Sequence, residues 1–224
     1  MKSILCVLFV FITLSSAFSQ NATHDTCGVA PGLKFVDAYT VVAEKNFLDD
    51  IEPLNADGTI NMVVEIPAGR TDKWEVKKDG WLHWDFKDEK PRIVQYLGYP
   101  CNYGMVPQTV LAKELGGDGD PLDCLVLGAS APRGSVLKVK VIGVIKLTEK
   151  GEQDDKLLTV RVEDPIYAAN NLAELNTKFP GVTAILETWF TNYKGPGALV
   201  CKGFGDVEEA RQILETALKS FKKM

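Results

Sequence analysis

Apolar and polar residues alternate along the middle of the chain, which is the pattern of β-strands with one buried face. The longest alternating run follows Ser135, with lysines on one face and these apolar residues on the other: Leu137, Val139, Val141, Ile145 and Leu147. Gly143, in the middle of this run, predicts a bend of the kind found in barrel strands. Shorter runs bounded by turn residues predict strands at 62–68, 73–76, 81–86, 92–97, 124–129 and 158–162.

The spacing of apolar residues becomes helical in the last third of the chain. It predicts helices over 170–178 and 180–193, and the apolar stripe of the second contains Ile185, Leu186, Trp189, Phe190 and Tyr193. Asp206 is predicted to cap a final helix, after a tight turn at 203–205. The patterns together predict a mainly β fold with α-helices: a small closed five-stranded OB-like β-barrel with appended C-terminal helices.

The N-terminus has the layout of a secretory signal peptide. Lys2 precedes an apolar run at 4–14, and small residues follow at the positions that a signal peptidase reads. The run is too short to span a bilayer. We therefore expect a signal peptide at 1–19, an N-terminal extension packed on the domain at 20–60, and one domain at 61–224. The product is expected to be exported, periplasmic or secreted, with no membrane anchor after cleavage.

Charge and residue counts exclude several classes of function. The chain has 25 Lys and Arg against 30 Asp and Glu, a net charge of −5, which argues against nucleic acid as a partner. It has only two histidines and no CxxC pair, which disfavours a zinc site and histidine-dependent hydrolases. Four cysteines remain after cleavage, and their disulfide pairing is left open: Cys27, Cys101, Cys124 and Cys201.

One loop carries three aspartates close to a strand that must be buried. The stretch GGDGDPLDCLVLG contains Asp118, Asp120 and Asp123, whose like charges repel and raise each other's pKa unless a cation lies between them. The stretch does not fit an EF-hand, because the sixth residue, counted with Asp118 as the first, is Asp123 rather than glycine. Crowded carboxylates without histidine favour Mg²⁺, Mn²⁺ or Ca²⁺.

The alternation of side chains also directs other charged residues toward the predicted barrel interior. Glu149 shares its face with Leu147, Asp154 and Lys156 share a face on the next strand, and Lys73 lies two residues from Glu75. Arginine and lysine at such a site bind anionic oxygens. Acids that hold metals beside bases that hold phosphate predict a metal–phosphate substrate.

Five blocks of the chain, in order, resemble those of the family I soluble inorganic pyrophosphatases. They are EIPAGRTDKWEV, YPCNYGMVPQT, DGDPLD, KGEQDDK and NYKG, and the resemblance covers residues 62 to 222. It implies a five-stranded barrel with helices and hydrolysis of pyrophosphate to two phosphates, with several Mg²⁺ ions as cofactor and Mn²⁺ as a possible substitute. We also expect a homo-oligomer.

The resemblance implies a role for each matching residue. Asp118, Asp123 and Asp154 would bind a first metal, with Asp123 shared with a second, and Asp120 would hold the attacking water between the ions. Further metal-site acids would be Glu65, Glu75 and Glu149. The substrate-binding residues would be Lys73, Arg92, Tyr99, Tyr103, Lys156, Tyr193 and Lys194. Those with a catalytic role would be Asp120, Lys73, Arg92, Tyr103 and Lys156.

One position departs from the family pattern and leaves an alternative open. The family usually has aspartate where this chain has Glu149, and the longer side chain changes how a carboxylate reaches a small ion such as Mg²⁺. A metal- or polyphosphate-binding module without turnover is therefore a second hypothesis. A nucleic-acid-binding barrel is a third, disfavoured by the acidic site.

Overall fold

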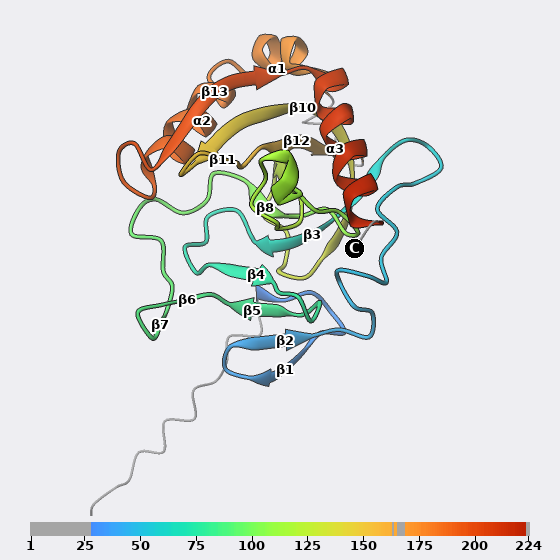
Figure 1. Ribbon diagram of the computed structural model, residues 1–224, viewed down its shortest axis with the longest axis vertical. Helices are drawn as coiled ribbons and strands as arrows, with labels where there is room; N and C mark the ends of the chain where they lie inside the picture. The colour runs from blue at the N-terminus through green and yellow to red at the C-terminus, as the bar shows by residue number, and fades with distance from the viewer. Residues whose placement is uncertain (1–27, 163, 165–168, 223–224) are drawn as a thin grey trace, which may run out of the picture.

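The described part of the computed structural model, residues 28–162, 164 and 169–222, contains a seven-stranded mixed sheet, a four-stranded antiparallel sheet, a two-stranded hairpin and three α-helices (Figure 1). The predicted signal peptide and Cys27 lie outside the described residues. No helix among the described residues is long and apolar enough to cross a membrane. A mainly β fold with helices was expected from the alternation, and that expectation is confirmed. The closure of the sheet into an OB-like barrel stays a prediction.

The larger sheet is organised around one long strand. Its seven strands are β3 (Ile60–Ile66), β8 (Asn102–Met105), β9 (Asp123–Leu127), β10 (Val136–Glu149), β11 (Glu152–Gln153), β12 (Lys156–Arg161) and β13 (Leu199–Gly205). β10 pairs with β3 near its start, with β12 along its middle, and with β13 and β11 toward its end. Only the β9–β12 pairing in this sheet is parallel, and it brings the starts of both strands to the same edge.

A β-bulge in β10 changes which face its residues occupy. The register against β12 shifts between Val141 and Gly143, so the run of alternate residues predicted to share one face is divided. Val139 and Val141 pack in one core cluster, whereas Ile145 and Leu147 pack in another. The prediction of a single face was wrong because an inserted residue reverses the alternation beyond it. Gly143 fits here because a Cβ would lie 2.7 Å from the Leu172 side chain.

The smaller sheet joins the N-terminal residues to the domain. Its strands are β1 (Lys34–Asp37), β2 (Thr40–Val42), β5 (Leu82–Trp84) and β4 (Trp74–Val76), in that order. Val41, Phe47 and Ile51 share a core cluster with residues of β4 and β5. The strand predicted at 92–97 is absent, and the short hairpin β6 (Phe86–Lys87) and β7 (Lys90–Pro91) precedes that segment.

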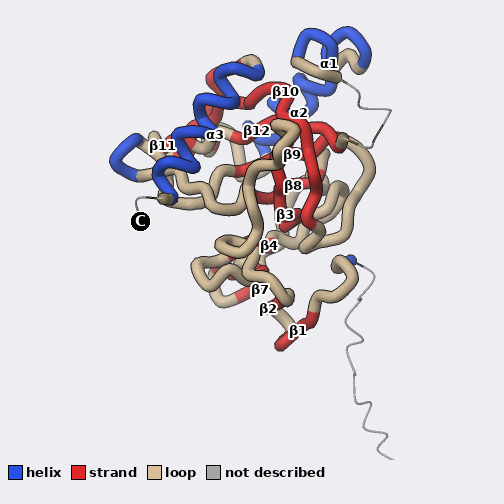
Figure 2. The backbone as a smooth tube through the Cα atoms, turned by 90° about the vertical axis from the view of Figure 1, so that its right-hand side faces the viewer, coloured by secondary structure: helices blue, strands red, loops and turns tan. Residues whose placement is uncertain are grey.

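The helices lie at one end of the larger sheet, away from the smaller one (Figure 2). They are α1 (Leu172–Lys178), α2 (Val182–Asn192) and α3 (Val207–Phe221), with a 3-10 turn, η2 (Lys113–Leu115), on the loop before β9. Asp206 caps α3 by accepting the backbone N–H of Glu209, as predicted. Two predictions here were wrong: Ile185 is 58% exposed, and residues 203–205 extend β13 rather than forming a tight turn.

A buried ion pair holds the two sheets together. The Arg133 guanidinium donates to Asp72 at 2.6 Å and to the Glu65 carbonyl at 2.8 Å, and it lies 4.6 Å from the Trp74 ring. The Trp74 indole also donates to Asp72, at 3.0 Å. Arg133 is only 5% exposed, so removing its charge leaves the buried Asp72 carboxylate with only the exposed Arg70, at 2.8 Å, as a counter-charge.

We expect Arg133→Gln to lower the free energy of unfolding by about 3–5 kcal/mol, the usual cost of breaking a buried ion pair. Urea unfolding followed by circular dichroism measures this loss. The double variant Asp72→Asn/Arg133→Gln removes both charges and is expected to be more stable than the single variant. A double variant no more stable than Arg133→Gln contradicts this account.

Candidate active site

All the predicted site residues except Tyr99 line one cavity of about 680 Å³. They are Glu65, Lys73, Glu75, Arg92, Tyr103, Asp118, Asp120, Asp123, Glu149, Asp154, Lys156, Tyr193 and Lys194. Alternation along strands places several of them, because Lys73 and Glu75 face the cavity while Asp72 and Trp74 face the core. The parallel register of β9 and β12 sets Asp123 beside Lys156.

Lys156 lies between two of the predicted metal ligands. Its buried ammonium donates to Asp123 at 2.5 Å and to Asp154 at 2.8 Å. Burial opposes the ammonium charge, but the two carboxylates more than compensate and raise the pKa of Lys156. Burial also raises the pKa of Asp123, although Lys156 opposes this. The lysine therefore offsets part of the charge of a carboxylate pair that is in no ion pair with any other cation of the described residues.

Hydrogen bonds along the loop shape the acidic segment before β9. Asp118 accepts the backbone N–H of Asp120 at 2.9 Å, and the Asp120 carbonyl accepts the N–H of Leu111 at 2.8 Å. Gly119 has φ +86, a left-handed conformation that favours glycine, and a Cβ there would lie 2.9 Å from the Lys113 side chain. The loop thus directs both carboxylates into the cavity.

Burial, and then repulsion from Asp120, Asp123 and Asp154, raises the pKa of Asp118 to about 6, although the N–H of Asp120 opposes this. Repulsion between the acids was expected from the sequence, but burial contributes more. An acid that holds its proton more tightly when folded adds stability at low pH, and loses it as the pH rises from its unfolded pKa of about 4 through its folded pKa.

We therefore expect the contribution of Asp118 to the free energy of unfolding of the metal-free protein to fall between pH 4 and about 6. Carboxyl carbon NMR measures the titration, with Asp118→Asn to assign the signal. In Asp118→Asn the pH-dependent loss of stability across this window should shrink. Titration of Asp118 near pH 4 in the metal-free protein contradicts the prediction.

A second ion pair on the cavity wall joins a lysine predicted to bind substrate to a glutamate predicted to be a metal-site acid. Lys73, which is buried, lies 2.6 Å from Glu75, and Lys77 pairs with the same carboxylate. Burial opposes ionisation of Glu75, but the two lysines lower its pKa to about 2. Glu65 accepts the backbone N–H of Val76 at 2.6 Å, and burial raises its pKa well above the usual range.

Lys77 is a cavity residue that the sequence analysis missed. It lines the cavity and shares the alternation of Lys73 and Glu75, so the same spacing that found those two would have found it.

Arg92 reaches the site from a loop, and its guanidinium donates to Asp85 at 3.0 Å. The predicted strand at 92–97 is therefore not needed to position it.

Tyr99 lies behind the cavity rather than on its wall. It is 1% exposed, and its ring packs against Tyr103, Trp189 and Tyr193. Its hydroxyl is buried and has no hydrogen-bond partner among the described residues. Burial raises the pKa of this hydroxyl, while nearby Lys73 opposes the shift.

The departure at Glu149 has a structural partner. Its carboxylate lies 2.5 Å from the Lys194 ammonium, and both side chains are half-buried at the cavity rim. A residue predicted to bind metal is thus paired with one predicted to bind phosphate.

The donor set at the cavity fits a hard divalent cation. The carboxylate oxygens of Asp118, Asp120, Asp123 and Asp154 share the cavity with no histidine or cysteine on its wall, which is the chemistry that Mg²⁺ and Mn²⁺ prefer. Within the described ranges, no three such side chains already converge as a preformed metal cluster. The Lys156 ammonium stands between two of the carboxylates, where a positive charge is needed.

The sequence model of the inorganic pyrophosphatase family matches residues 62–222. The mitochondrial inorganic pyrophosphatase of Saccharomyces cerevisiae is 34% identical over 185 residues, which cover 74% of this chain and 59% of the yeast protein. The inorganic pyrophosphatase of Schizosaccharomyces pombe is 38% identical over 159 residues, which cover 63% of this chain and 55% of the Schizosaccharomyces pombe protein. The chain thus spans less than two thirds of these relatives.

A solved structure has the same fold. The inorganic pyrophosphatase of Schistosoma japonicum aligns with a TM-score of 0.77 at 26% sequence identity, over 82% of this chain and 75% of that protein.

Proposed function

Because the chain belongs to the inorganic pyrophosphatase family, we propose that it hydrolyses pyrophosphate to two phosphates. The observation that supports this most is the single cavity that joins the four aspartates to the lysines and Arg92. Carboxylates and cations within one cavity complement a metal-bound diphosphate better than either group alone.

The residues of the chain divide the work between anion binding and proton transfer. Lys73, Arg92, Lys156 and Lys194, with the hydroxyls of Tyr103 and Tyr193, bind and orient the phosphate oxygens. Asp120 accepts the proton of the attacking water, because its carboxylate faces the cavity and is in no ion pair with another described residue. We place Tyr99 behind the phosphate site, because its buried hydroxyl has no hydrogen-bond partner among the described residues.

The cofactor proposed is Mg²⁺, with several ions and with Mn²⁺ as a substitute. Asp118, Asp123 and Asp154 would hold a first ion, and Glu65, Glu75 and Glu149 are the further acids of the site. When bound, such ions lower the pKa of a coordinated water and neutralise charge on the leaving phosphate.

Release of phosphate tests this function. We expect two phosphates per pyrophosphate consumed with Mg²⁺ or Mn²⁺, and none after the metal is removed with EDTA. Metal-dependent binding of pyrophosphate without phosphate release would favour the alternative of a binding module, for which the Glu149–Lys194 pair is the supporting observation.

The remaining expectations concern the chain as a whole. We infer that residues 1–19 direct export to the periplasm or outside the cell and are then removed, an inference supported by their charge and hydrophobicity pattern alone. The proposed division into an extension at 20–60 and a pyrophosphatase domain at 61–224 is supported by the family match at 62–222. A closed OB-like barrel is supported by pairing of β3 with both β8 and β10. A homo-oligomer without nucleic-acid or membrane partners completes the proposal.

A further inference from the structure

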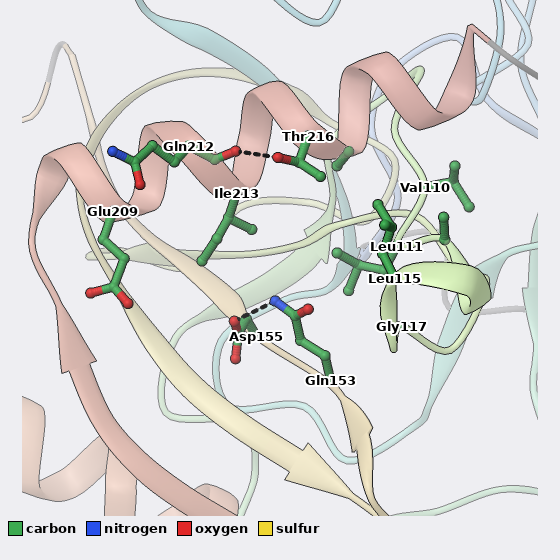
Figure 3. A pocket seen from close by; sticks show the side chains of 12 residues that line it. Val110, Leu111, Leu115, Gly117, Gln153, Asp155, Glu209, Gln212, Ile213 and Thr216 are labelled. Carbon is green, nitrogen blue, oxygen red and sulfur yellow. Dashed lines mark hydrogen bonds between the residues drawn. The ribbon is translucent and has the colours of Figure 1, made fainter.

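A second cavity lies behind the acidic loop, on the side away from the proposed active site. Its volume is about 420 Å³, and it is enclosed by α3, by residues 110–117 and by the segment that joins β11 to β12 (Figure 3). Its walls differ in character. Leu111, Leu115 and Ile213 form an apolar side, while Gln153 and Asp155 form a polar one. A volume of this size suits a small organic ligand.

The polar side presents a buried carboxylate without a counter-ion. Asp155 is 6% exposed, and its oxygens accept the Leu147 N–H at 3.0 Å and the Gln153 amide at 2.7 Å. No lysine or arginine of the described ranges lies within ion-pair distance of it. Each carboxylate oxygen keeps a lone pair for a further donor. Because a buried aspartate is normally paired with a cation, its environment is electrostatically incomplete.

The other charges at the cavity do not supply the missing cation. Glu209, at the rim, pairs with Lys146 at 2.8 Å, so that pair is neutral as a unit. The cavity therefore keeps the negative charge of Asp155. On the apolar side, Leu115 is 59% exposed, and covering such a side chain is favourable.

We propose that this cavity binds a small organic cation, a primary ammonium on an apolar body. The ammonium donates to Asp155, and the apolar body packs between Leu115 and Ile213. A carboxylic acid would be repelled by Asp155, and a neutral alcohol would leave its charge uncompensated.

An occupant of the cavity would also contact the back of the acidic loop. The Gly116 carbonyl accepts the Gln153 N–H at 2.8 Å, and the Leu111 N–H donates to the Asp120 carbonyl at 2.8 Å. Leu111 and Gln153 both line the cavity, so a ligand between them braces the segment that carries Asp118 and Asp120. Binding is therefore expected to slow amide exchange at Gly117 and Gly119, whose N–H groups bond to the carbonyls of Ala112 and Leu111.

Calorimetric titration of the folded chain with hexylammonium, hexanol and hexanoate tests the proposal, in the absence of metal and pyrophosphate. The result is then independent of whether the chain hydrolyses pyrophosphate. Hexylammonium is expected to bind with one-to-one saturation, and hexanol and hexanoate at least tenfold more weakly. Asp155→Asn should weaken hexylammonium binding at least tenfold. Glu215→Gln, which removes an exposed carboxylate of α3 outside the cavity, should leave it unchanged.

Thr216→Phe provides a second variant that does not depend on Asp155. Thr216 lies on the cavity wall and is exposed, so a phenyl ring there fills the space without entering the core. This variant should abolish binding and the slowing of amide exchange. Absence of saturable hexylammonium binding, equal affinity for hexanol, or wild-type binding by Thr216→Phe would each overturn the proposal. If Asp155→Asn fails to fold, Thr216→Phe and the three ligands decide the question.

Discussion

The Asp120→Asn variant is expected to lose pyrophosphate hydrolysis by about 10²- to 10⁴-fold, the range for removing a positioned acid–base group. Burial, and then the negative charge of Glu75, raises the pKa of Asp120, which makes its carboxylate a better proton acceptor. Asparagine keeps the size of the side chain and its place on the loop, but cannot take a proton from water. Initial rates of phosphate release at saturating metal measure the loss.

The matched control for this variant is Glu114→Gln, which removes an exposed carboxylate from η2 on the same loop and outside the cavity. It should retain wild-type rates. Asp120→Asn should also retain its midpoint of unfolding and its affinity for Mn²⁺. Rates within threefold of wild type for Asp120→Asn would exclude Asp120 as the proton acceptor.

The Lys156→Met variant is expected to lose about 3–5 kcal/mol of unfolding free energy in metal-free buffer, the usual cost of breaking a buried charge pair. Its ammonium is the only cation of the described residues that is ion-paired with Asp123 and Asp154. Methionine fills a similar volume but leaves the buried carboxylate of Asp154 and the half-buried one of Asp123 without their counter-charge. Urea unfolding measures the loss.

A divalent ion should restore part of this stability, because it binds the folded state and neutralises the same carboxylates. Lys138→Met, which removes an exposed lysine paired with Asp57, should change stability little, and metal should stabilise it no more than it stabilises the wild type. Equal destabilisation of both variants, or a Lys156→Met variant that Mg²⁺ does not stabilise, contradicts the assignment of Asp123 and Asp154 to a cation site.

Alternation along strands was sufficient to bring most of the site together from the sequence. Lys73, just before β4, and Glu75, within it, lie two apart, and Asp123 begins β9, so a period of two directs each of them to the same cavity. The C-terminal helix was likewise predictable, because Asp206 has a local capping role.

Features that depend on pairing between distant segments could not be predicted. The bulge in β10 arises where β12 shifts register, and it redirects half of the strand. β8 and β13 contain glycine or few alternating apolar residues, and they are strands because β9 and β10 supply their partners. The Glu149–Lys194 contact depends on the β10–β13 pairing, which sets Leu199 opposite Glu149 and so brings the loop before β13, which carries Lys194, beside the end of β10.

The most direct test is a crystal structure of the protein with Mn²⁺ and the non-hydrolysable analogue imidodiphosphate. The account predicts anomalous scattering peaks at about 2–2.5 Å from the carboxylates of Asp118, Asp123 and Asp154. It also predicts that the Lys156 ammonium donates to a phosphate oxygen of the analogue. A structure with no anomalous peak at these carboxylates, and with Lys156 still between Asp123 and Asp154, would contradict the proposal that this cavity is a metal-dependent pyrophosphate site.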